Sequence, residues 1–427
     1  CEMVAESVSM RSGVIIRLTT WSDNEDKPKH EEVSVVVNQG VYAIAGKEVQ
    51  RQLLTGLLPK YKLDSYRAVI RTEKTMTAPS VFCGFQLFAS AVTALSLHTS
   101  RMAAKANLTP AKFITDFMSP ETRFTDMAPV HELATLSSKI RRVTDKSDYT
   151  RKWASSNLHT GEFGLAGYLS GIGLSYGLGI AGFSTTTARE NEFKAQVAYT
   201  LKKNVAVSGT VPAYMAYDKT TKDTLSRFFY KGDTNETVLF TEIDQETPDS
   251  GPDVLSSYTS IFLPQLMTAT VRLGQLIDQQ DPPVNLKFSA QNLSSPCEFE
   301  YSGFGAAVCE ISISKTSLQP VAKRVWIDVA LSTIYGKTSK QRVKSLVLQT
   351  LTQLGAELAP DFSLEMNLSS EGKDVTTFSS IESTVTSLTM GAYTNAIWQA
   401  TGEHMSVSLP AKAKAIEKIL NGGKGEN

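Results

Sequence analysis

A basic and aromatic stretch between residues 139 and 153 carries the residue types that bind nucleic acid. Six of its first 14 residues are Lys or Arg, and aromatic side chains lie among them. Cations neutralise phosphates and aromatic rings stack on bases, so this combination is typical of RNA-binding surfaces. A further aromatic residue and two lysines follow downstream. The predicted RNA-binding residues are Lys139, Arg141, Arg142, Lys146, Tyr149, Arg151, Lys152, Trp153, Tyr168, Lys202 and Lys203.

The alternative interpretation of this stretch is the solvated face of a helix. Asp145 and Asp148 lie among the cations and reduce the net positive charge. Charge runs on helices commonly face solvent without binding anything. Both interpretations stay open at the level of sequence.

A glycine-rich segment follows at residues 161–183. Eight of its 23 residues are glycine, and residues 163–183 carry no charge. Each glycine inside a helix costs about 1 kcal/mol relative to alanine, so another group is expected to approach this backbone closely. Three interpretations are open. They are a helix in a tightly packed interior, a transmembrane helix with small residues four apart, and a backbone surface beneath RNA phosphates.

Part of this segment resembles a viral motif. The aromatic and glycine motif of nucleoproteins from negative-strand RNA viruses runs F-x4-Y-x3-Φ-S-Φ-A-M-G. Five positions follow that spacing here: Phe163, Tyr168, Ile172, Leu174 and Gly177. Gly173 replaces the serine, and residues 175–176 are Ser-Tyr instead of Ala-Met. The resemblance implies RNA bound through its sugar–phosphate backbone without base specificity, and polymerisation through the terminal segments.

Motifs for catalysis and metal binding are missing from the sequence. The five histidines are scattered, and His131-Glu132 lacks the second histidine that a zinc-protease motif requires. There is no G-x-S-x-G elbow and no GxxxxGK[ST] loop. His98 lies in an apolar run and is interpreted as a satisfied core residue. We therefore expect no enzyme, no cofactor, no metal and no small-molecule substrate, with a site assembled from distant residues as the last-ranked alternative.

The four cysteines also exclude a disulfide scaffold or zinc ribbon, because they are few for 427 residues and form no CxxC pair. Cys297 and Cys309 flank a predicted hairpin, so either a bridge between them or two free thiols is possible.

The charge balance excludes a strongly basic arm or acidic tail as the dominant feature. The chain has 43 Lys and Arg against 43 Asp and Glu, and 41% of its residues are apolar. That apolar content is enough to bury a core. The net charge of zero is a sum over uneven segments: residues 139–153 and 189–203 have a local excess of positive charge, and residues 241–253 have an excess of acidic residues. We therefore expect RNA binding that depends on assembly.

The periodicity of the chain predicts an α+β protein with a predominantly helical central region between β-rich N-terminal and C-terminal parts. The predicted domains are 1–80, strand-rich; 81–281, mainly helical; and 282–427, α+β. No repeat with a period of about 20–50 residues is present. Helices are predicted at 47–58, 85–106, 109–117, 130–143, 252–279, 339–354 and 410–420. Strands are predicted at 13–18, 32–37, 41–44, 66–70, 237–241 and within 284–334.

These features favour a viral structural protein, a nucleocapsid or coat subunit that self-assembles and encapsidates RNA. Its partners would be RNA and copies of itself, and it would reside in the virion and the host cytoplasm. One alternative is an icosahedral capsid shell protein with little RNA contact. The other is a membrane-active protein that uses residues 163–183, although a membrane partner is less favoured because the run is only weakly apolar.

Overall fold

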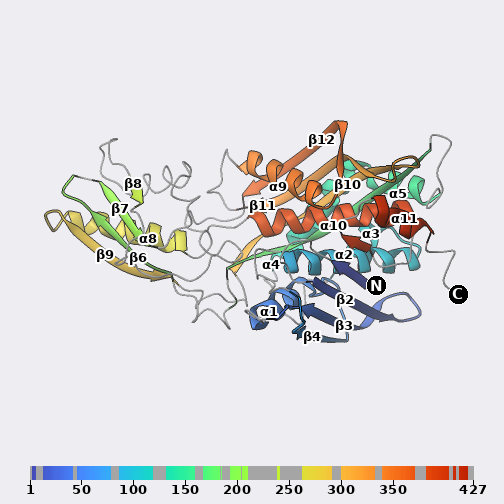
Figure 1. The fold of residues 1–427 in the computed structure, drawn as a ribbon, viewed down its shortest axis with the longest axis horizontal. Coiled ribbons are helices and arrows are strands. Elements are labelled where there is room, and N and C mark those ends of the chain that lie inside the picture. Colours follow the sequence, from blue (N-terminus) through green and yellow to red (C-terminus); the bar gives the residue numbers. More distant parts are fainter. Residues whose placement is uncertain are drawn as a thin grey trace.

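The computed structural model shows two β-sheets covered by helices, with a smaller sheet unit beside them (Figure 1). The residues that it describes are 2–5, 13–41, 46–77, 86–118, 131–158, 167–182, 184, 193–202, 204–209, 238–240, 262–290, 300–331, 339–370, 381–402, 407–409 and 413–421.

The first sheet has the order β13-β1-β2-β3-β4. Its strands are β1 (Glu2–Ala5), β2 (Gly13–Ser22), β3 (Pro28–Asn38), β4 (Ser65–Glu73) and β13 (Val407–Leu409). β2 and β3 alternate apolar and polar residues, which is the period of a strand with one buried face. Helix α1 (Gly46–Gly56) connects β3 to the parallel strand β4. The buried face carries Val14, Ile16, Leu18, Val33, Val35 and Val37.

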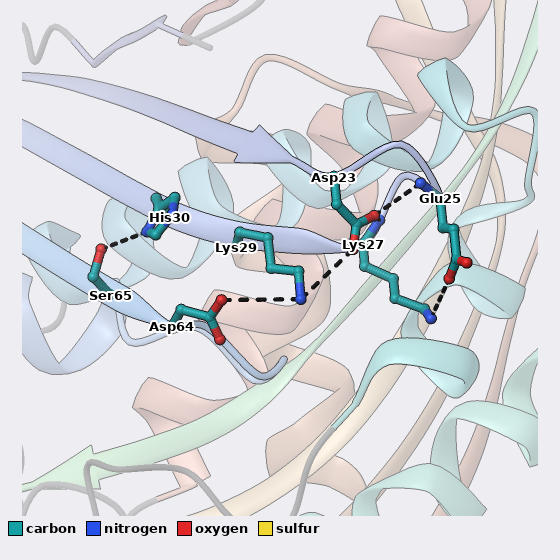
Figure 2. A network of polar contacts seen from close by, with 7 residues as sticks. All are labelled: Asp23, Glu25, Lys27, Lys29, His30, Asp64 and Ser65. Atoms are coloured by element: carbon teal, nitrogen blue, oxygen red, sulfur yellow. Dashed lines mark hydrogen bonds and ion pairs between the residues drawn. The ribbon is translucent and has the colours of Figure 1, made fainter.

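An exposed polar network closes the turn between β2 and β3 (Figure 2). Asp23 Oδ1 accepts hydrogen bonds from the backbone N–H groups of Glu25 (2.9 Å) and Lys27 (3.0 Å). Lys29 Nζ lies 3.5 Å from Asp23 Oδ2 and 3.9 Å from Asp64 Oδ2. The network therefore ties the turn to the residue that precedes β4. Exposed pairs of this kind contribute at most about 1 kcal/mol each.

The second sheet repeats the topology of the first. It has the order β12-β11-β10-β5, with β5 (Tyr168–Ala181), β10 (Glu300–Ser314), β11 (Pro320–Leu331) and β12 (Glu357–Ser370). In each sheet two antiparallel pairings are followed by a parallel one, which a helix connects. Helix α9 (Ser339–Gln353) makes this connection here. The repeat is longer than the periods sought in the sequence, and an insertion between β5 and β10 interrupts it.

A buried helix follows each half of this repeat. Helix α2 (Gln86–Lys105) comes after β4, and helix α10 (Ile381–Thr401) comes after β12. The two helices pack against each other, and α10 also covers β5 and β10. On the opposite face of the second sheet lie α4 (His131–Ser147) and α5 (Tyr149–Asn157), with α3 (Pro110–Phe117) beside α4. The second sheet is therefore the middle layer of an α/β/α arrangement.

The described part of the glycine-rich segment is mainly strand β5 and not the helix that two of the three interpretations required. Small residues occupy alternate positions from Gly171 to Gly179, and large apolar residues lie between them. The large residues pack against the α4 and α5 side. The small residues face the other way, where a Cβ built on Gly173 would lie 2.2 Å from Ala392 O. The predicted close approach is confirmed, and the approaching group is the backbone of α10.

Polar side chains of α10 satisfy the backbone of β5, which is an edge strand. Gln399 Oε1 accepts a hydrogen bond from the Ile172 N–H at 2.6 Å, and Asn395 Nδ2 donates to Leu174 O at 2.8 Å. Ser383 Oγ donates to Ile180 O at 2.6 Å. Buried backbone groups without partners are costly, so this helix combines small residues with buried Ser, Asn and Gln.

The insertion between β5 and β10 contains a separate small unit. Strands β6 (Phe193–Tyr199), β7 (Val205–Gly209), β8 (Val238–Phe240) and β9 (Val284–Ala290) form a sheet in the order β8-β7-β6-β9. Helix α8 (Leu263–Ile277) packs on β6 and β9 and shares an apolar core with them. The last helix, α11 (Ala413–Asn421), contributes Ile416 to the main core.

Most predicted helices are confirmed, because α1, α2, α3, α4, α9 and α11 lie within or close to their expected ranges. α8 begins at Leu263, and residues 252–261 of that prediction lie outside the described part. So does most of the strand predicted at 41–44. Helices α5 and α10 were not predicted. The domain ranges stay a prediction, and the main core draws residues from all three of them.

Candidate functional site

Two of the predicted RNA-binding cations on α4 pair with a buried carboxylate of the protein. Lys139 is 2% exposed, and its Nζ lies 3.2 Å from Asp328 Oδ1 and 2.8 Å from Ser369 Oγ. Arg142 Nη1 lies 2.7 Å from the other carboxylate oxygen of Asp328. The Lys139 ammonium also sits 5.1 Å from the centroid of the Phe304 ring. These cations therefore neutralise a buried carboxylate on β11.

The end of this basic stretch, on α5, packs inward in the same way. Lys152 Nζ lies 2.7 Å from Glu310 Oε2 and 4.7 Å from the centroid of the Trp326 ring. Tyr149 and Trp153 are core residues, 1% and 9% exposed. Buried rings cannot stack on bases in this conformation.

The remaining predicted residues do not form one surface with these. Arg141 is exposed and pairs with Asp145 on α4, and the exposed Arg151 pairs with Asp148, the residue that precedes α5. Lys146 and Lys202 are also exposed, and Tyr168 is 52% exposed at the start of β5. Lys203 and Phe163 lie outside the described residues.

A second group of buried ionisable side chains lies between the first sheet and α2, and the sequence analysis did not identify it as a group. Glu31 on β3 is 2% exposed. Its Oε2 accepts hydrogen bonds from Tyr61 Oη and, at 2.9 Å, from Thr20 Oγ1 on β2. Thr20 Oγ1 lies 2.7 Å from His98 Nε2 on α2. His98 is thus a satisfied core residue, as predicted, and a member of a polar cluster.

Burial shifts the pKa values of Glu31 and His98 in opposite directions. Desolvation raises the pKa of the Glu31 carboxyl from 4.5 to about 7, although the hydrogen bonds from Tyr61 and Thr20 oppose the shift. Desolvation lowers the pKa of the His98 imidazole from 6.5 to about 3, and the charge of Arg101 acts in the same direction. The pKa of the Tyr61 hydroxyl is raised by burial and by the neighbouring Glu31. Glu31 is therefore the group in this cluster that titrates near neutral pH.

Glu31→Gln is expected to change how stability depends on pH. A carboxyl whose folded pKa is raised stabilises the fold fully below its unfolded pKa, and this contribution is lost as pH rises through the folded value. The variant lacks that loss. Its free energy of unfolding, relative to wild type, should therefore increase by about 3 kcal/mol between pH 4.5 and pH 7. Urea unfolding at a series of pH values measures this difference.

Glu32→Gln is the matched control for this measurement. Its carboxylate is 46% exposed and lies 3.5 Å from Arg67 Nη1, so we expect a pH-dependent difference below about 0.5 kcal/mol. If the stability curves of Glu31→Gln and wild type run parallel across this pH range, Glu31 does not bind a proton there.

Only a weak sequence signal pointed to this cluster. Glu31 and His98 are polar residues at positions where the local pattern predicts burial, His98 in an apolar helix and Glu31 beside a β-branched run. The residues come from separate elements, so no spacing within one motif joins them. Within the described part of the chain, no group of three or more His, Cys, Asp or Glu residues could hold a metal ion.

By sequence, the chain matches no protein-family model and no curated protein. Its fold does match solved structures. The aldehyde oxidoreductase from Desulfovibrio desulfuricans ATCC 27774 superimposes on 96% of the chain with a TM-score of 0.78 and 15% identity. Quinoline 2-oxidoreductase from Pseudomonas putida 86 gives a TM-score of 0.70 and 10% identity, and CO dehydrogenase from Oligotropha carboxidovorans gives 0.73 and 13%, each over 96% of the chain. The chain spans 49%, 62% and 61% of the lengths of these three structures.

These matches overturn the viral interpretation. The predicted nucleocapsid or coat function is wrong, and so are RNA as the partner, the absence of a small-molecule substrate and the virion as the location. The resemblance to viral nucleoproteins came from a short motif, whereas the fold match covers 96% of the chain. The expectation that the chain is not an enzyme is also wrong, because the matched proteins are oxidoreductases.

The membrane alternative gains no support from the fold. The described part of residues 163–183 is mainly strand β5, and no helix among the described residues is long and apolar enough to cross a membrane. Across nearly its whole length, the chain is similar in fold to oxidoreductases that act on aldehydes, quinoline and carbon monoxide.

Proposed function

We propose that this chain forms part of an oxidoreductase that acts on a small uncharged molecule. The observation that carries the proposal is the fold match over 96% of the chain, with TM-scores of 0.70 to 0.78. The substrates named for the matched proteins, an aldehyde, quinoline and CO, are all small and neutral. Because the chain spans only 49–62% of their lengths, the complete activity would belong to a larger assembly.

One matched CO dehydrogenase is described as a Cu,Mo enzyme. The described residues do not fit a metal held directly by side chains, since no cluster of three or more His, Cys, Asp or Glu residues occurs among them. Cys309, on β10, is fully buried, and burial raises the pKa of its thiol, so the thiolate form that binds metals is disfavoured. No reaction step is therefore assigned to a metal on these residues.

The described core would act in such an enzyme as a rigid support. Helix α10 is in backbone contact with β5, and three of its polar side chains hold the edge of that strand. The ion pairs of Asp328 with Lys139 and Arg142 fix α4 to β11, which lies in the middle of the second sheet. Active sites need supports that hold reacting groups in place.

The test is a dye-linked assay on the full-length protein expressed in its native host. Aliphatic and aromatic aldehydes, quinoline and CO are supplied in turn, and reduction of an artificial electron acceptor is followed. Oxidation of an aldehyde by water gives a carboxylic acid, two protons and the two electrons that reduce the dye. We expect reduction with at least one substrate class, above the rate of a heat-denatured sample. No reduction with any of them would overturn the proposal.

A further inference from the structure

A continuous hydrogen-bonded network joins β2, β3, α2 and the connection between α1 and β4. It runs from Tyr61 Oη to Glu31 Oε2, then to Thr20 Oγ1 and finally to His98 Nε2. Glu31, Tyr61 and His98 are 2%, 4% and 6% exposed. Thr20 is only partly buried. Water therefore has little access to three of the four members of this network, whose hydrogen bonds are made mainly to one another.

Counting the protons shows that this hydrogen-bonded network has two possible patterns of donors and acceptors. Thr20 has one hydroxyl proton and two neighbours, so it donates to one and accepts from the other. If Glu31 is ionised, Thr20 donates to the carboxylate, and His98 must carry its proton on Nε2 to donate to Thr20. If Glu31 is protonated, its Oε2–H donates to Thr20, Thr20 donates to His98 Nε2, and the imidazole carries its proton on Nδ1. Tyr61 donates to Glu31 in both.

We propose that protonation of Glu31 sets the tautomer of His98 through Thr20, so that these three residues form a proton relay between α2 and β3. The change from ionised to protonated Glu31 takes up one proton in total. This proton binds His98 at Nδ1, the Nε2 proton passes to Thr20 Oγ1, and the hydroxyl proton of Thr20 passes to Glu31 Oε2. No bond between heavy atoms changes. The inference does not depend on the proposed oxidoreductase function.

The geometry around Glu31 favours proton uptake. Glu31 Oε1 is buried and has no hydrogen-bond partner in the described structure. A buried oxygen without a hydrogen-bond partner destabilises the ionised carboxylate more than the protonated carboxyl, because the carboxylate places negative charge on that oxygen. The pKa of the carboxyl, raised to about 7, agrees with this geometry and places the change near neutral pH.

The surroundings keep His98 neutral while Glu31 titrates. Desolvation lowers the pKa of the imidazole, and the charge of Arg101, one turn further along α2, acts in the same direction, so the ring changes tautomer and does not become charged. The other ionisable groups near Glu31 have raised pKa values and stay protonated. They are Tyr66 on β4 and Tyr176 on β5, whose hydroxyls donate to Leu57 O and Thr99 Oγ1. Lys60 Nζ donates to Leu58 O at 2.8 Å, and burial lowers the pKa of this amine to about 8.

Nitrogen NMR of the full chain labelled at its histidine rings tests the relay, because a protonated and an unprotonated ring nitrogen give well-separated signals. We expect His98 Nε2 to be protonated at about pH 8.5 and unprotonated at about pH 5.5, with one midpoint near the pKa of Glu31. Thr20→Val keeps the shape of the side chain and removes the hydroxyl. In that variant, and in Glu31→Gln, the tautomer should not follow pH.

Glu32→Gln, in the exposed neighbour of Glu31, should behave as wild type. Circular dichroism at each pH shows whether each variant is folded, and Thr20→Ala replaces Thr20→Val if that variant unfolds. A single His98 tautomer across this pH range in the folded wild-type protein would overturn the relay. A tautomer change that persists in folded Thr20→Val would also overturn it, because the coupling would then bypass Thr20.

Discussion

Gly173→Ala is expected to destabilise the protein by more than about 3 kcal/mol, at the upper end of what overpacking costs. A Cβ at this position would lie 2.2 Å from Ala392 O, 2.3 Å from Ala396 N and 2.7 Å from Asn395 C. All three are backbone atoms of α10, so no side chain can rotate away. Relief requires α10 to move from β5, which would also break the hydrogen bonds of Asn395 and Gln399 to that strand.

Gly177→Ala is the matched control on the same strand. Its Cβ would meet only Val92 Cγ1, at 3.5 Å, which is an ordinary van der Waals contact. We expect a change within about 1 kcal/mol in either direction, since alanine also restricts the unfolded chain. Urea unfolding followed by circular dichroism measures both variants. Equal effects at the two positions would show that α10 does not lie against the β5 backbone as described.

Asp328→Ala is expected to cost about 3–5 kcal/mol, because it leaves a buried charge without its counter-ion. The Lys139 ammonium, whose side chain is 3% exposed, would keep Ser369 Oγ as its only described hydrogen-bond partner. Arg142 would lose the same carboxylate, but its side chain is 46% exposed and can turn to water. The loss should therefore come mainly from Lys139.

Two variants separate this explanation from simple loss of packing. Glu310→Ala removes the partner of Lys152, whose side chain is 23% exposed, and should cost about 1 kcal/mol. Adding Lys139→Met to Asp328→Ala removes the stranded charge and should recover much of the lost stability in thermal or urea unfolding. If the double variant is less stable than Asp328→Ala alone, the buried charge is not the source of the loss.

Local patterns predicted most helices and strands but misassigned β5, because the glycines were compared only with helical spacing. From Gly171 to Gly179, small residues alternate with Ile172, Leu174, Tyr176 and Leu178. That period of two indicates a strand with one smooth face. Helix α10 was missed for a related reason. It is buried on nearly all sides, so it shows no polar stripe from which a helical period could be detected.

The basic stretch shows the limit of composition as a guide to function. The residue types were identified correctly, but the direction in which they point depends on the sheet beneath α4 and α5. Asp328 and Glu310, which attract Lys139 and Lys152, lie more than 150 positions away in the sequence. Cations beside aromatic rings serve an RNA surface and a buried ion pair equally well, so residue type alone cannot distinguish them.

By itself, the sequence determined many of the local elements, the apolar faces of β2 and β3, and the requirement that something lie against the glycine-rich backbone. These follow from periodicity and from the missing side chain of glycine, both of which are local properties. The tertiary structure decided which group meets the glycines, which cations are buried, and that Glu31 and His98 share one hydrogen-bonded chain. Those relations depend on contacts between elements far apart in the sequence, where packing and desolvation set partners and pKa values.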